Sequence, residues 1–246
     1  MNQNKGLLDR NANRYASNMV GDGLSFAATE AYKRLRTNIL FSFAGESSCK
    51  IIGVTSSLRG EGKSTTSANL AYSLAEAGKY TLLLDADMRL PNVHKKTGVN
   101  QSPGLSNLLV GMHDGANLIQ SSDMHKNLKI MSAGDIPPNP TELLSSKRMG
   151  GTLNLLCEKY DYIIIDLPPV DVVADALIVS KLAHGMIIVV RQNYVDKNTL
   201  DNTVRQMKYH EANILGLVVN CAESNEKYYK GKYYARHKYY KKDIED

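Results

Sequence analysis

Short apolar runs alternate with longer segments of mixed character along this chain. We predict that these runs are strands, at residues 51–54, 80–84, 128–131, 162–165, 186–191 and 214–219. Continuous apolar strands indicate burial on both faces, which is typical of parallel sheets covered by helices. The pattern therefore predicts an α/β fold with a mostly parallel central sheet and helices on both faces.

Segments with helical spacing of apolar residues separate the strands. Leu35, Ile39 and Phe43 recur every four residues, so a helix is predicted from Thr29, a fair N-cap, to Phe43. An alanine-rich helix is predicted over residues 68–77. Further helices are predicted at residues 105–110, 116–119, 141–145, 153–160, 173–182 and 198–209.

Residues 54–65 form a glycine-containing loop between the first strand and the alanine-rich helix. Strand, glycine loop and helix are the context of a phosphate-binding loop, whose backbone amides surround phosphate oxygens. In such a loop Lys63 reaches the β- and γ-phosphates and the Ser64 hydroxyl binds Mg²⁺. The match is imperfect because Ser57 replaces the usual first glycine, and the alternative is a turn that only starts a helix. The predicted nucleotide-binding residues of the loop are Ser57, Gly60, Glu61, Gly62, Lys63, Ser64 and Thr65.

Three aspartates follow predicted buried strands. Asp85 and Asp87 come directly after the second run, and Asp166 ends the β-branched run at 162–165. Open α/β sheets bind ligands beyond the carboxyl ends of their strands. In phosphate-loop enzymes an aspartate placed like Asp166 holds Mg²⁺ or its water shell. The alternatives are a solvated loop of charges for the first pair and a turn-capping aspartate for Asp166.

The charge of the chain is uneven. Its net charge is +5 over 246 residues, and residues 226–246 contribute +3 from seven Lys/Arg against four Asp/Glu. Six of the fourteen tyrosines also lie there, in three pairs separated by basic residues. A segment like this cannot bury a core, so it is predicted to be flexible. The six tyrosines are Tyr228, Tyr229, Tyr233, Tyr234, Tyr239 and Tyr240.

Length and composition predict one main domain with two flexible ends. We divide the chain into an arm (1–25), a phosphate-loop domain (26–221) and a tyrosine-rich tail (222–246). The three cysteines show no metal or disulfide spacing, which suits a reducing cytosol. The first twenty residues lack the apolar core of a signal peptide, and no run approaches the ~18 residues of a membrane span. Membrane association is therefore expected to come through a partner.

These motifs together resemble the bacterial tyrosine kinases (BY-kinases) of capsule and exopolysaccharide synthesis. The resemblance covers roughly residues 29–246, and its carriers are the loop, the segments 82–89 and 163–169, the segment 134–144 and the terminal tyrosines. It implies a P-loop NTPase fold of the SIMIBI-like type and an ATP- and Mg²⁺-dependent kinase that phosphorylates its own tail. It also implies a separate membrane-anchored activator, a cognate phosphatase and a cytoplasmic protein recruited to the inner face of the membrane.

The resemblance assigns roles to the polar residues of the site. Ser64 would be a direct Mg²⁺ ligand, while Asp87 and Asp166 would hold the metal's waters. Asp85 is the candidate base for the tyrosine hydroxyl, although a carboxylate with a pKa near 4 cannot deprotonate a phenol in advance. Related ATPases place an asparagine against adenine where Asn220 stands, and a turn residue is the alternative there.

A charge pattern in the first predicted helix resembles the motif that assembles the family into rings, Glu-x-x-Arg-x-x-Arg. The matching residues are Glu30, Lys33 and Arg36, with Arg34 beside them. Lys33 departs from the motif, and lysine lacks the planar fork of arginine. A solvated helix face is the alternative. Arg59 stands where the family often has proline.

Two other classes of function compete with the kinase. Partition- and septum-type ATPases carry a signature lysine at the position of Leu58 and have no tyrosine cluster, so both features disfavour that class. A nucleic-acid-binding module would use the basic, aromatic tail for stacking. The modest charge of the whole chain and the intact phosphate loop argue against nucleic acid as a partner.

Overall fold

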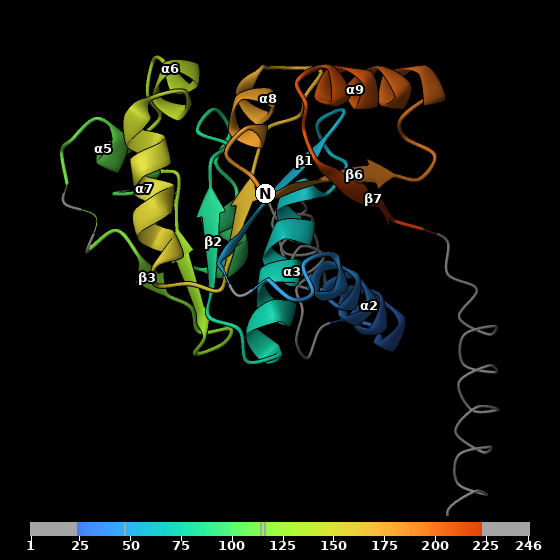
Figure 1. Cartoon of the computed structure of the whole chain (residues 1–246), viewed down its shortest axis with the longest axis horizontal. Helices are drawn as coiled ribbons and strands as arrows, with labels where there is room; N and C mark the ends of the chain where they lie inside the picture. The colour runs from blue at the N-terminus through green and yellow to red at the C-terminus, as the bar shows by residue number, and fades with distance from the viewer. Residues whose placement is uncertain (1–23, 47, 114, 116, 223–246) are drawn as a thin grey trace, which may run out of the picture.

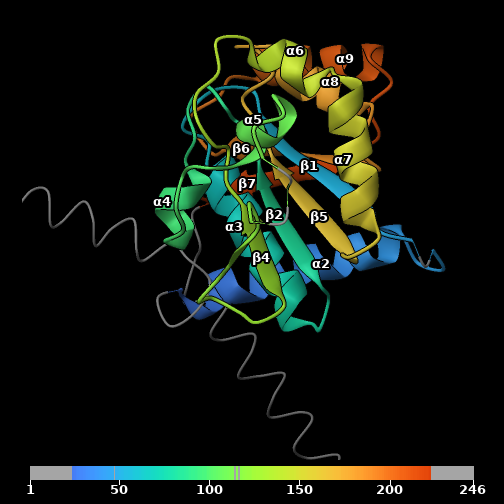
Figure 2. The same ribbon diagram turned by 90° about the vertical axis from the view of Figure 1, so that its left-hand side faces the viewer.

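A seven-stranded sheet forms the centre of the computed structural model, which describes residues 24–46, 48–113, 115 and 117–222. The strand order is β3-β4-β2-β5-β1-β6-β7. Figure 1 labels β3, β2, β1, β6 and β7, and Figure 2 adds β4 and β5. All neighbouring strands are parallel except β3 and β4, which confirms the predicted mostly parallel sheet. The strands are β1 (Lys50–Ser56), β2 (Thr81–Asp85), β3 (Gln120–Ser121), β4 (Leu128–Met131), β5 (Tyr162–Asp166), β6 (Gly185–Arg191) and β7 (Ile214–Asn220).

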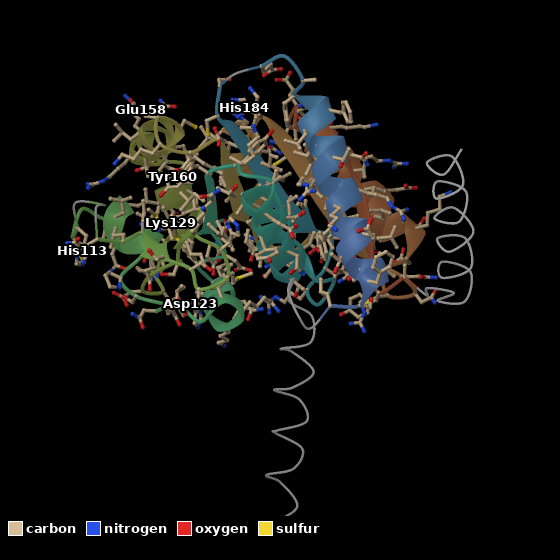
Figure 3. All side chains as sticks on the ribbon, turned by 90° about the horizontal axis from the view of Figure 1, so that it is seen from below. His113, Asp123, Lys129, Glu158, Tyr160 and His184 are labelled. Atoms are coloured by element: carbon tan, nitrogen blue, oxygen red, sulfur yellow. The ribbon has the colours of Figure 1, made fainter. Side chains whose placement is uncertain are left out.

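Helices cover both faces of the sheet (Figures 1 and 2). Successive strand residues point to opposite faces, so Ile164 packs in one core cluster and its neighbours Ile163 and Ile165 pack in the other. On the Ile164 side α2 lies against α3 (Figure 3). The helices are α2 (Phe26–Ser42), α3 (Lys63–Glu76), α4 (Val93–Thr97), α5 (Leu105–Leu109), α6 (Pro140–Leu144), α7 (Lys147–Cys157), α8 (Asp175–Ser180) and α9 (Lys197–Tyr209).

The first described helix begins earlier than its sequence predicts. Its N-cap is Ser25, whose hydroxyl accepts a hydrogen bond from the Ala28 amide at 3.3 Å. Thr29 lies inside the first turn, and its hydroxyl donates to the Ser25 carbonyl. The predicted start at Thr29 was wrong because two hydroxyl residues both suit a cap, and the earlier one caps the helix.

Two further boundaries differ from the prediction. The described residues of segment 116–119 form a turn instead of a helix. The helix predicted at 153–160 begins at Lys147 and ends at Cys157, with Ser146 as its N-cap. Two consecutive glycines, which are poor helix formers, lie in its first half and obscure the helical pattern. The short α4 and β3 were not predicted individually.

The predicted arm (1–25) and tail (222–246) lie outside the described residues, except for residues 24, 25 and 222. Within the described residues, no helix combines the length and the apolar character needed to cross a membrane.

Candidate functional site

The phosphate loop leaves the carboxyl end of β1, a central strand, and enters α3. Gly60 and Gly62 both have left-handed backbones, with φ of 84° and 97°. A Cβ on Gly62 would lie 1.9 Å from the side-chain nitrogen of Asn220, which donates to the Glu61 carbonyl at 2.8 Å. Glycine is therefore required here for its backbone conformation and for the close approach of β7.

The Glu61 side chain holds the loop together from inside the protein. It is buried, and its carboxylate accepts hydrogen bonds from the Leu58 amide at 2.7 Å and the Arg191 amide at 3.2 Å. This contact joins the loop to the end of β6. Of the predicted nucleotide-binding residues, Glu61 can thus offer a ligand its backbone but not its carboxylate.

Ser57, the departure from the usual glycine, also points into the protein. Its hydroxyl accepts a hydrogen bond from Thr203 of α9 at 2.8 Å, and the side chain is fully buried. The Thr203 hydroxyl also contacts Asp171 at 3.1 Å. The fold therefore accommodates a side chain at this position in the protein interior, against α9.

Lys63 lies between two of the three aspartates predicted at the site. Its ammonium is 2.7 Å from Asp87 and 3.9 Å from Asp166, and 3.5 Å from the Ser64 hydroxyl. Burial acts to lower the pKa of Lys63, but the carboxylates of Asp166 and Asp87 outweigh it and hold the pKa above its ordinary value. The structure thus brings Lys63, Ser64, Asp87 and Asp166 together as a charged cluster.

Asp85 lies beneath this cluster, without exposed surface. Its carboxylate accepts hydrogen bonds from the amides of Asp87, Asn92 and Val93 at 3.1, 3.2 and 3.1 Å, and so caps the start of α4. Burial, followed by the neighbouring Asp166 carboxylate, raises the pKa of Asp85 to about 8. This shift makes Asp85 a stronger base than an ordinary aspartate.

The oxygen atoms around Lys63 fit a magnesium ion. Asp166 is fully buried, and its Oδ1 accepts from the Ser67 hydroxyl at 3.0 Å, whereas Oδ2 has no hydrogen-bond partner among the described residues. Burial raises the pKa of Asp166, and the Lys63 ammonium opposes that rise. Protein carboxylates do not form a metal cage by themselves in the described part of the chain. Mg²⁺ commonly uses one or two carboxylates together with substrate phosphates, and Asp87, Asp166 and Ser64 supply that kind of partial set.

A cavity of about 1160 Å³ opens above the loop. The first half of α2 and the end of β7 border it on one side, and α4 borders it on the other. Asp87 is the one carboxylate among the described residues that line it, because Asp85 and Asp166 are buried below. The cationic side chains of the lining are Arg34, Arg59, Lys63, Arg89, Lys95, Lys96 and Arg191.

Sequence reasoning missed an ion pair that holds one wall of the cavity. Arg89 donates to both oxygens of Asp175 in α8, at 3.0 and 3.3 Å, and to the Thr141 hydroxyl at 2.8 Å. Asp175 is fully buried, and Thr141 also donates to it at 2.8 Å. The two residues are 86 positions apart, so no local sequence pattern predicts this ion pair.

The charged residues of α2 have partners within the chain. Glu30 and Lys33 form a salt bridge at 3.0 Å. Arg36 donates to the Ser73 carbonyl of α3 at 2.7 Å and lies 3.5 Å from Glu76. Arg36 therefore attaches α2 to α3. The six tail tyrosines lie outside the described residues.

The chain is similar to known proteins at the levels of family, sequence and structure. A family model described as ParA, "NUBPL iron-transfer P-loop NTPase", matches residues 48–242. The tyrosine-protein kinase YwqD of Bacillus subtilis is 38% identical over 192 residues, which are 78% of this chain and 80% of that protein. The putative tyrosine-protein kinase CapB of Staphylococcus aureus is 33% identical over 212 residues, 85% of this chain and 92% of that one.

The chain belongs to the bacterial tyrosine-protein kinases. The crystal structure of the chimerical protein CapA2B2 matches this kinase with a TM-score of 0.77 and 33% identity, over 82% of this chain and 88% of that one. The kinase also belongs to the wider class of P-loop NTPases, whose phosphate loop in general binds nucleotide phosphates and Mg²⁺. The relatives favour a kinase over the partition-type ATPase that the sequence left as an alternative.

Proposed function

We propose that this chain is an ATP-dependent protein-tyrosine autokinase that phosphorylates its own C-terminal tyrosines and regulates capsule or exopolysaccharide synthesis. The observation that carries the proposal is the position of Lys63, between Asp87 and Asp166 and beside Ser64, at the base of a strongly cationic cavity. Phosphoryl transfer depends mainly on positioning and charge neutralisation, and this arrangement supplies both.

Ser64, Asp87 and Asp166 would hold Mg²⁺, which neutralises charge on the transferring phosphate when it is bound. Lys63 and the loop amides bind the phosphate oxygens and orient the γ-phosphoryl group. Asn220, which already fixes the loop through Glu61, lines the cavity where adenine would lie.

The acceptor is a tyrosine hydroxyl whose oxygen bonds to the γ-phosphorus while the bond to ADP breaks. Asp85 receives the phenol proton in this proposal, and its raised pKa suits that task. Because Asp85 is buried and bound to three amides, the start of α4 has to shift before a hydroxyl reaches it. Asp87, which lines the cavity, would orient the acceptor together with the metal.

We further propose that copies of the chain form a ring in which the tail of one copy reaches the site of its neighbour. Glu30 and Lys33, paired on the surface of α2, would contact the neighbour, and Arg36 would support them by anchoring α2 to α3. The expected partners are a membrane-anchored activator, which recruits the cytoplasmic kinase to the inner face of the membrane, and a cognate phosphatase. Nucleic acid is not an expected partner.

The test is to incubate the full chain with ATP and Mg²⁺ and to map phosphotyrosine by mass spectrometry. Lys63→Met and Asp85→Asn are each expected to reduce tail phosphorylation at least about 100-fold, since both remove a group from the reaction. Thermal unfolding of each variant serves as the control for folding. Tail phosphorylation that persists in a folded Lys63→Met variant would overturn the proposal.

A mixing experiment tests transfer between copies. Lys63→Met protein supplies tyrosines without activity, and active protein with all six tail tyrosines changed to phenylalanine supplies activity without acceptors. Phosphate on the Lys63→Met chain is the expected result. Labelling of the parent protein together with an unlabelled Lys63→Met chain would show that each copy modifies only itself.

A further inference from the structure

The lysines of α4 lie at the reactive end of the cavity. The first amides of α4 bind Asp85, so Lys95 and Lys96 follow within one helical turn of the carboxylate cluster. Both line the cavity, and α4 packs beside α3 (Figure 2). Burial lowers the pKa of Lys96, and Asp166 and Lys63 are close enough to influence it.

These lysines lie on the side away from the strand that ends in Asn220. In the sheet, β2 leads to α4 and lies two positions from β1, while β7 lies two positions from β1 in the opposite direction. With adenine placed at Asn220, the γ-phosphate points toward β2. Lys95 and Lys96 therefore border the part of the cavity where the acceptor enters, beyond the nucleotide.

The cavity is larger and more positive than a nucleotide requires. Ligand pockets usually measure about 300–1,000 Å³, and this cavity measures about 1160 Å³. Seven cationic side chains and one carboxylate line it among the described residues. Lys63 and Arg89 already have carboxylate partners in Asp87 and Asp175. The nucleotide phosphates, partly neutralised by Mg²⁺, balance only some of the charge of the other five cations. An anionic group on the acceptor would complement the remaining positive charge of the cavity.

The unmodified tail does not carry such a group. Residues 226–246 have a net charge of +3, and lysine or arginine flanks the tyrosine pairs. Like charges would disfavour a basic tail in a basic cavity. A phosphate changes this locally, because each one adds about −1.5 to −2 charges and three strong acceptor oxygens. The tyrosines occur in three adjacent pairs, so a newly made phosphotyrosine always has another tyrosine beside it.

We propose that Lys95 and Lys96 bind a phosphotyrosine already present in the tail and thereby favour transfer to a tyrosine close to it. This inference rests on the proposed autophosphorylation of the tail. The lysine ammonium groups donate charge-assisted hydrogen bonds to the phosphate oxygens, which are stronger than neutral ones. The kinase thus prefers a partly phosphorylated tail, and labelling accelerates after the first transfer.

The test compares two full chains in which Tyr240 is the sole tail tyrosine. The other five tail tyrosines are phenylalanine in one chain and glutamate, a phosphate mimic, in the second. The initial rate of Tyr240 phosphorylation is measured by mass spectrometry. We expect the glutamate chain to be labelled roughly fivefold faster. In a Lys95→Ala/Lys96→Ala background the ratio should fall below about twofold. A Lys197→Ala/Lys208→Ala background, which removes the same charge from α9, should keep it.

Direct binding supplies a second measurement. A peptide copy of residues 236–242 that carries phosphotyrosine at Tyr239 is titrated against the full chain, and the unphosphorylated peptide is the control. We expect tighter binding of the phosphopeptide in the parent and loss of that difference in Lys95→Ala/Lys96→Ala. Equal rates for the two Tyr240 chains, or the same ratio in both lysine backgrounds, would overturn this inference and leave the proposed function standing. Absence of tail phosphotyrosine in the unmodified parent would instead overturn the proposed function.

Discussion

Gly62 is the most constrained position of the phosphate loop, and Gly62→Ala gives a quantitative test of how the loop is held. Alanine at a φ of 97° carries a backbone strain of about 1–2 kcal/mol. Its Cβ also displaces the Asn220 side chain, which lies 1.9 Å from the Cβ position, and so breaks the hydrogen bond to the Glu61 carbonyl. A lost hydrogen bond of this kind costs about 1 kcal/mol.

The total of about 2–3 kcal/mol acts on the conformation of the loop that binds phosphate. If that conformation is destabilised by this free energy, ATP affinity falls by a factor of about 30–150. The assay is titration of the protein with ATP and Mg²⁺ by calorimetry. Thermal unfolding is expected to change little, because the loop rearranges locally while the sheet and α3 stay packed.

Asn220→Ala provides the matched control. In that background alanine at position 62 no longer collides with the amide, so only the backbone strain remains. The effect of Gly62→Ala on affinity should then be about fivefold smaller than in the parent, which corresponds to the single hydrogen bond. A Gly62→Ala protein that binds ATP within threefold of the parent would refute this account of the loop. An effect of equal size in both backgrounds would show that Asn220 does not contribute.

Three further predictions concern other parts of the site. Arg89→Ala leaves the buried Asp175 carboxylate without its cation and should lower the free energy of unfolding by about 3 kcal/mol, measured by denaturant titration; an unchanged midpoint would contradict the structural role of the pair. Excess chelator should abolish tyrosine phosphorylation, because in the proposed site Asp87, Asp166 and Ser64 hold the Mg²⁺ that phosphoryl transfer needs; undiminished labelling would exclude a metal role. Glu30→Ala should shift the protein toward monomer in gel filtration without lowering its melting temperature. Arg36→Ala should shift it toward monomer and also lower its melting temperature. Identical behaviour of the two variants would count against the separate roles of these residues.

The elements that carry the site could be predicted because parallel topology localises strand ends. Asp85 and Asp166 each end an apolar run, and the carboxyl ends of parallel strands meet at one edge of the sheet. The same reasoning placed Lys63 and Ser64, since a phosphate loop follows the first strand. These predictions needed only the order of elements along the chain and the parallel direction of the strands.

The directions of side chains were not predictable in the same way. Ser57 and Glu61 belong to the loop by sequence, yet both point inward because Thr203 and the Arg191 amide offer them buried hydrogen bonds. The Thr203 partner is 146 positions from Ser57. Such contacts depend on which distant elements become neighbours, so they emerge only from the packed structure.

Asn220 is the last residue of β7, and its side chain is hydrogen-bonded to the phosphate loop. The tail is therefore tethered next to the nucleotide site of its own copy. A short tether gives its end a high effective concentration near the anchor, which falls as the tether lengthens. Tyr228 is 8 residues from Asn220 and Tyr240 is 20, which limits their reach to about 28 Å and about 70 Å at ~3.5 Å per residue. The order in which the tail tyrosines are phosphorylated therefore reports the distance from Asn220 to the site that modifies them. Early phosphorylation of the distal tyrosines indicates a distant site, and early phosphorylation of the proximal tyrosines indicates a site close to Asn220.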